Sequence, residues 1–116
     1  MQKIEKWRIH QLAMSIGRIA DLLKRGGDLE WANVFLHYRL EINAFLTSES
    51  PNMTALKQMV DNIRNCYSGI QSFINLTLSS KDSGKGEDLN KDFIRERALL
   101  YEIILGLDEK FVEYTH

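Results

Sequence analysis

Apolar side chains in residues 28–45 recur at helical spacing on two sides of the predicted helix. One stripe has successive spacings of 4, 3, 4 and 3 and consists of Trp31, Phe35, Tyr38, Ile42 and Phe45. A second stripe, about a third of a turn away at ~3.6 residues per turn, consists of Leu29, Ala32, Leu36 and Leu40. A helix that is apolar on two sides needs cover on both. We therefore predict that residues 28–45 form the central helix of the domain.

The residues before this stretch predict a helix from about residue 3 to residue 24 with a single apolar stripe. The stripe consists of Ile4, Trp7, Leu12, Ile16, Ile19, Ala20 and Leu23. Gly26 and Gly27 then provide a left-handed exit from the helix, and Asp28 is a good N-cap for the next one. These signals predict a tight hairpin of two antiparallel helices.

A third helix is predicted after Ser50 and Pro51, which suit the N-cap and the first helical position. Its one apolar side consists of Met53, Leu56, Val60, Ile63, Tyr67 and Ile70, and Gly69 is its predicted end. For residues 72–78 a short extended segment and a last helical turn both fit, and periodicity does not decide between them.

Residues 79–88 contain no apolar side chain and are rich in Ser, Gly and charged residues, which predicts a flexible surface loop. Asp88 then caps a long final helix that reaches Glu113. With 116 residues, 44% of them apolar and 27% charged, the chain suits one globular domain. The predicted fold is an all-α, antiparallel four-helix bundle-like domain over residues 1–116, with an extended segment near 72–78 as the open alternative.

Candidate chemical groups are few and scattered. The histidines are His10, His37 and His116, and only His37 has a potential ligand one helical turn away, at Glu41. A zinc site needs three or four ligands at a recognisable spacing. Cys66 has neither the base nor the orienting group that a nucleophile needs. We therefore expect no metal, no cofactor and no enzymatic activity.

The charge distribution limits the class of partner. A net charge of −1 argues against nucleic acid. The N-terminal segment has charges among its apolar residues, so we expect neither a signal peptide nor a membrane span, and the single cysteine suits the cytoplasm. Residues 1–27 nevertheless carry a charge of +4 and residues 102–116 a charge of −3. These ends are either paired with each other, which we favour, or the acidic end faces a basic partner.

Three features together resemble a family of small bacterial helical proteins of the toxin-immunity type. The second helix opens with a Gly-acidic-x-x-Trp-Ala pattern over residues 27–32, and residues 67–76 read YSGIQSFINL where the family has a Tyr-x-Gly-Met-Gly-Ser-Phe-Asn-Asp-Leu-like run. A polar loop before one long terminal helix is the third feature. Gln71 stands where the family pattern has glycine, and Ile74 and Asn75 stand where it has an Asn-Asp pair.

The resemblance implies an immunity protein that binds a cognate bacterial toxin domain and blocks it by covering it. Acidic side chains can occupy the basic cleft of a nuclease toxin. Our candidate partner-binding residues are Glu41, Glu49, Asp108, Glu109 and Glu113. The alternative is a small structural or adapter module that acts through helix–helix contacts. For both, the sequence leaves open whether the protein is a monomer or a homodimer.

Overall fold

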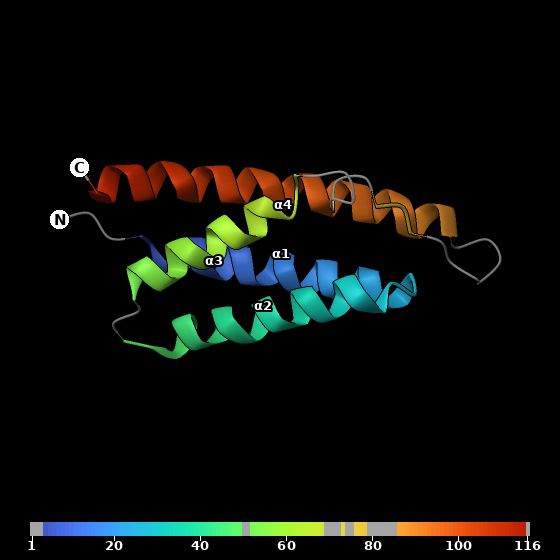
Figure 1. Ribbon diagram of the computed structural model, residues 1–116, viewed down its shortest axis with the longest axis horizontal. Helices are drawn as coiled ribbons and strands as arrows, with labels where there is room; N and C mark the ends of the chain where they lie inside the picture. The colour runs from blue at the N-terminus through green and yellow to red at the C-terminus, as the bar shows by residue number, and fades with distance from the viewer. Residues whose placement is uncertain (1–3, 50–51, 69–72, 74–75, 79–85, 116) are drawn as a thin grey trace.

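The computed structural model describes residues 4–49, 52–68, 73, 76–78 and 86–115, and within α4 the side chains of residues 89–112. The described chain forms four α-helices, which are α1 (Lys6–Arg25), α2 (Leu29–Thr47), α3 (Met53–Asn65) and α4 (Gly86–Thr115) (Figure 1). No strand occurs in this part of the chain. The predicted all-α fold is confirmed.

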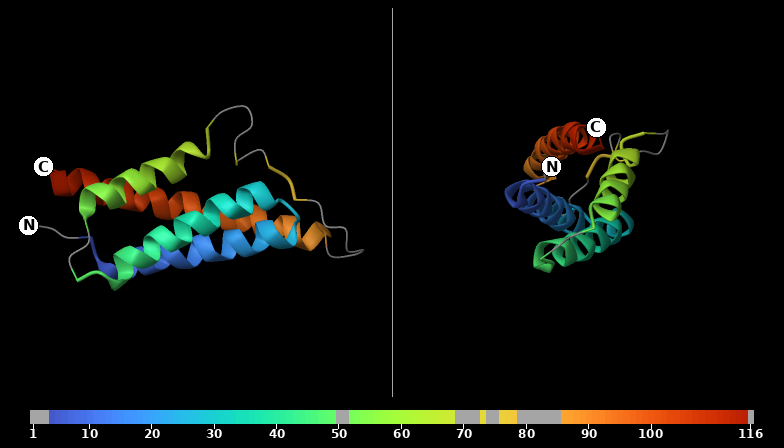
Figure 2. Two further views of the ribbon diagram at one scale, coloured as in Figure 1. Left: turned by 60° about the horizontal axis from the view of Figure 1, so that its bottom comes forward. Right: turned by 90° about the vertical axis from the view of Figure 1, so that its left-hand side faces the viewer.

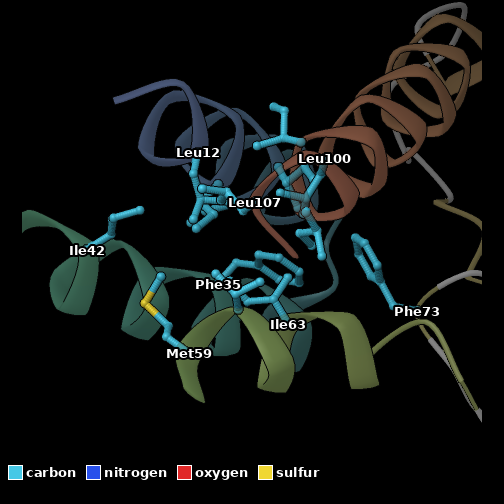
Figure 3. Packing of buried hydrophobic residues seen from close by; sticks show 14 of the residues in the cluster. Leu12, Phe35, Ile42, Met59, Ile63, Phe73, Leu100 and Leu107 are labelled. Atoms are coloured by element: carbon cyan, nitrogen blue, oxygen red, sulfur yellow. The ribbon is translucent and has the colours of Figure 1, made fainter. Parts of the chain in front are cut away.

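The helices are arranged in a ring around one core (Figure 2). α1 packs against α2 on one side and α4 on the other, and the shorter α3 packs against α4 and α2. As a result, α2 and α4 lie on opposite sides of α1 (Figure 1). All four helices contribute to the core, where Leu12, Phe35, Ile63, Leu100 and Leu107 converge (Figure 3).

The corner between α1 and α2 is built as the sequence predicts. Gly27 has a φ of +81°, in the left-handed region that favours glycine. The amides of Gly26, Gly27 and Asp28 donate to the carbonyl groups of the last turn of α1. The Asp28 carboxylate accepts a hydrogen bond from the Trp31 amide at 3.1 Å and so caps α2. The predicted hairpin and its cap are confirmed.

Replacing the Asp28 cap tests how much the corner contributes to stability. We expect Asp28→Ala to lower the free energy of unfolding by about 1 kcal/mol, because the Trp31 amide loses its acceptor. Asp28→Ser keeps a capping oxygen and should stay within about 0.5 kcal/mol of the parent. Urea unfolding followed by circular dichroism measures both. Equal losses in the two variants would show that the carboxylate does not act as a cap.

The prediction that α2 is the central helix is wrong. Its first stripe faces the core, with Phe35 and Ile42 fully buried, but Leu29 and Leu40 of the second stripe are 61% and 71% exposed. The reason is that α1 and α3 both pack on the first side of α2, and no described element remains to cover the second. α1, which packs between α2 and α4, is the central helix.

Several predicted boundaries also need correction. The N-cap of α3 is Asn52, whose side-chain oxygen accepts from the Ala55 amide at 3.1 Å, and residues 50–51 lie outside the described part. α3 ends at Asn65 rather than at residue 69. α4 begins at Gly86 and ends at Thr115, so the last three residues of the predicted 79–88 loop are helical, whereas 79–85 lie outside the described part. Of residues 72–78, only 73 and 76–78 are described, and they form neither strand nor α-helix.

Candidate functional site

The five candidate acidic residues do not form one cluster. Glu41 and Glu49 belong to α2 and the bend after it, whereas Asp108, Glu109 and Glu113 belong to α4, on the opposite side of α1 (Figure 1). The side chain of Glu113 lies outside the described part. The structure therefore divides the candidates between two separate surfaces.

Two of these carboxylates are engaged within the protein. Glu41 is half-buried, with its Oε1 atom 2.8 Å from Nε2 of His37. Asp108 is also half-buried and forms an ion pair with Arg64 that joins α3 to α4. Glu49 and Glu109 are exposed. Glu49 and Glu109 are therefore accessible to a partner, whereas Glu41 and Asp108 would have to exchange an internal contact for an external one.

The uneven charge along the chain has a structural counterpart in the packing of α1 on α4. The start of α1 and the end of α4 lie at the same end of the molecule (Figure 1), which brings the basic and the acidic segments together. Further along the same pair of helices, Arg18 Nε and Glu96 Oε1 are 2.6 Å apart. Glu96 precedes the acidic segment 102–116, and Asp108 of that segment pairs with Arg64 of α3, so these ion pairs join α4 to α1 and α3 without pairing the two charged segments with each other.

An exposed row of leucines runs along the outer side of α2. It consists of Leu29, Leu36 and Leu40 and is called the α2 row here; Leu36 is 38% exposed. These residues recur at spacings of 7 and 4, so they lie on one face of the helix. Glu30, His37 and Glu41 follow one edge of that face. The outer side of α2 thus has an apolar centre and a predominantly acidic edge.

A second exposed row runs along the outer side of α4. It consists of Ile94, Ala98, Tyr101, Leu105 and Val112 and is called the α4 row here. The sequence-based prediction gave only the extent of this helix and did not identify the row. Its spacing of 4, 3 and 4 from Ile94 to Leu105 is a signal from which the sequence could have revealed it.

The environment of Cys66 agrees with a structural role for this residue. Its Sγ atom lies 3.8 Å from the Tyr38 hydroxyl and 3.5 Å from the Asn62 carbonyl oxygen. Burial raises the pKa of the Cys66 thiol above its ordinary value and raises that of the Tyr38 hydroxyl as well. Because the thiolate is the reactive form of cysteine, these surroundings do not prepare Cys66 for nucleophilic attack.

The described residues also include an open groove of about 430 Å³ between α1 and α2. Its lining combines Gly17 and Met14 with polar side chains, among them His10, Arg18 and Arg39. Ligand sites that enclose a small molecule are concave and mostly apolar. This groove is open and its lining is about equally polar and apolar, so it does not have the form of such a site.

The described chain places no group of three or more His, Cys, Asp or Glu side chains where they could hold a metal ion. None of its described helices is both long and apolar enough to cross a bilayer. Comparisons with models of protein families, with curated proteins and with solved structures found no match. The exposed apolar rows on the outer sides of α2 and α4 are therefore the main candidate binding surfaces of the described chain.

Proposed function

We propose that this protein is a cytoplasmic immunity protein that binds a cognate bacterial toxin domain and blocks it by covering its active cleft. The observation that carries the proposal is the α2 row, in which Leu40 is 71% exposed on a well-packed helix. Exposed apolar side chains rimmed by polar residues are typical of protein-binding surfaces. Inhibition by coverage requires such a surface and a stable scaffold, and requires no reactive group.

The acidic edge of the α2 row supports a basic partner. Glu30 is exposed and Glu41 lies on the same side, while Glu49 is exposed beyond the end of the helix. Complementary charges at the rim of an interface accelerate association and select the partner. Exposed leucines at the centre would then be desolvated in the complex. This arrangement suits a cleft with basic walls and an apolar floor, as expected for a nuclease toxin.

The test uses the C-terminal domain of a secreted polymorphic protein encoded by the neighbouring reading frame. We expect it to co-purify with this protein and to lose its toxicity in co-expression. Leu40→Arg should weaken binding by roughly tenfold to a hundredfold, because it introduces a positive charge at the apolar centre of the surface. Isothermal titration calorimetry measures the change in affinity.

Leu105→Arg is the matched control, because it introduces the same side chain on the opposite side of the molecule. It should leave toxin binding unchanged. Binding that is equally weakened by both substitutions would show that the α2 row has no specific part in the interaction. Failure of the parent protein to bind or to protect would leave the immunity function without support.

The exposed α2 row also favours a second candidate, a structural or adapter module whose α2 packs against a helix of another subunit. Size-exclusion chromatography separates the two functions. Self-association that Leu40→Arg abolishes would favour the module, because the leucines would then be buried between copies. Retention of the parent elution volume by this variant would favour the inhibitor.

A further inference from the structure

The outer side of α4 has the sequence pattern of a coiled-coil seam. From Ile94 to Leu105 the α4 row repeats every 4, 3 and 4 residues, and Val112 follows seven residues later. Ile94, Leu105 and Val112 are 47%, 44% and 56% exposed, although the helix is already buried on its other side through Phe93, Leu100, Ile104, Leu107 and Phe111. Alternating spacings of 3 and 4 on an exposed face are typical of a helix that pairs with another helix.

Exposed charged residues follow one edge of this seam. Arg95, Glu102 and Glu109 recur on this edge at intervals of seven residues, and all three are exposed; Arg95 and Glu102 directly follow Ile94 and Tyr101 of the row, and Glu109 follows Asp108. The other edge is engaged within the protein, as is Tyr101 of the seam, whose ring centroid lies 4.9 Å from that of Tyr67. There Ile104 and Phe111 are buried, and the Arg97 guanidinium donates to the carbonyl oxygens of Phe73 and Leu76. A partner helix would therefore meet exposed charges along the first edge.

We propose that α4 of a second copy of this chain packs antiparallel on the α4 row and forms a symmetric dimer. Four of the five row residues pair with one another when α4 of the second copy runs in the opposite direction and is centred between Leu99 and Leu100; Val112 lies outside this set. In that register Ile94 faces Leu105 of the second copy, and Ala98 faces Tyr101. A small residue opposite a large one allows close packing in both halves of the interface.

The charged residues beside the α4 row are also arranged so that opposite charges meet in this antiparallel register. Arg95 of one copy lies within two positions of Glu102 of the other, and Lys91 lies next to Glu109; Asp108, at the position opposite Lys91, already forms an ion pair with Arg64 of its own chain. In an antiparallel helix pair, equivalent edges of the two helices face each other, so both copies contribute the same ion pairs. A parallel pair would instead place the acidic halves of the two helices side by side. Charge complementarity therefore selects both the second copy as the occupant and the antiparallel orientation.

The position of α4 in the fold leaves room for this contact. α4 forms one long edge of the molecule, with α1 on its inner side (Figure 1). Helix α2, which carries the α2 row, lies across α1 from α4 (Figure 1), so a dimer formed through α4 leaves the row free for another protein. The dimer and the inhibitory function can thus be tested independently.

Sedimentation equilibrium over a wide range of concentrations tests the dimer. We expect the parent protein to dimerise reversibly, and Leu105→Glu to weaken the dimer by roughly a hundredfold, because two carboxylates would enter the seam. Leu40→Glu is the matched control on α2 and should leave the dimer unchanged. Circular dichroism verifies that both variants stay helical. A parent protein that is monomeric throughout, or a dimer that Leu105→Glu leaves intact, would overturn the proposal.

Charge reversal tests the orientation and the register. Arg95→Glu and Glu102→Arg should each weaken the homodimer by roughly tenfold or more, because each replaces two attractions with two repulsions. Mixing the two variants should restore the parent affinity in a heterodimer, in which every pair across this edge is again opposite in charge. Native mass spectrometry distinguishes the heterodimer by mass. A mixture that associates no better than either variant alone would refute the antiparallel register.

Discussion

Replacing Phe73 with alanine is expected to lower the free energy of unfolding by about 3 to 5 kcal/mol, the range for deleting a buried phenylalanine. Phe73 is completely buried although it lies between α3 and α4 (Figure 3). Its ring centroid is 4.8 Å from that of Phe35 and 5.3 Å from those of Trp31 and Phe93. Removal of the ring would leave a cavity where α2, α4 and the connection meet.

The backbone at Phe73 explains why the surroundings would not collapse easily onto such a cavity. Its amide donates to the Cys66 carbonyl oxygen at 2.8 Å, and its own carbonyl oxygen is held by Arg97. Phe73→Leu retains most of the buried volume and should cost less than about 1.5 kcal/mol. Urea unfolding monitored by tryptophan fluorescence measures both variants. A loss below about 1 kcal/mol for Phe73→Ala would show that the ring is not part of the core.

Replacing Arg97 with methionine is the second change with a large expected effect, a loss of about 3 kcal/mol or more. Nη1 of Arg97 donates to the carbonyl oxygens of Phe73 and Leu76, both at 2.9 Å. Each buried carbonyl group that loses its donor costs about 1 to 3 kcal/mol. The guanidinium carbon also lies 5.1 Å from the centroid of the Phe93 ring. Arg97 thus fastens the connection between α3 and α4 to the core.

Two further variants separate this role from a general effect of charge. Arg97→Lys keeps the positive charge but lacks the planar fork, so we expect a loss between those of the parent and Arg97→Met. Arg39→Met removes an exposed arginine from α2 and should stay within about 0.5 kcal/mol of the parent. Chemical denaturation provides all three values. Equal effects of Arg97→Met and Arg39→Met would contradict the structural role of Arg97.

Local signals in the sequence were sufficient to predict the four helices and the corner between α1 and α2. The apolar periodicity predicted all four helices, and Gly27 with Asp28 predicted the hairpin because a left-handed residue and a capping carboxylate act within a few residues of each other. The position of α2 could not be obtained in this way. An apolar stripe shows that a face is suited to burial, but whether another element reaches that face depends on the lengths and crossings of all the helices.

The residues that hold the α3–α4 connection in place also could not be predicted from the spacing of apolar side chains. Phe73 lies outside any regular stripe, and Arg97 resembles any other charged residue on a helix until its two carbonyl partners are placed beside it. The candidate acidic residues were chosen for their charge alone, and two of them already have partners within the chain: Asp108 forms an ion pair with Arg64, and Glu41 lies 2.8 Å from Nε2 of His37. Exposure and internal pairing are properties of the folded chain and decide which of these residues a partner can reach.

The central claim is that this protein acts by binding through the outer side of α2. Isothermal titration of the purified protein with the toxin domain from the neighbouring reading frame, combined with a toxicity assay on the same samples, tests it most directly. We expect saturable binding with loss of toxicity, weakened by Leu40→Arg and unaffected by Leu105→Arg. Absence of binding, or a Leu40→Arg variant that binds and protects as well as the parent, would contradict it.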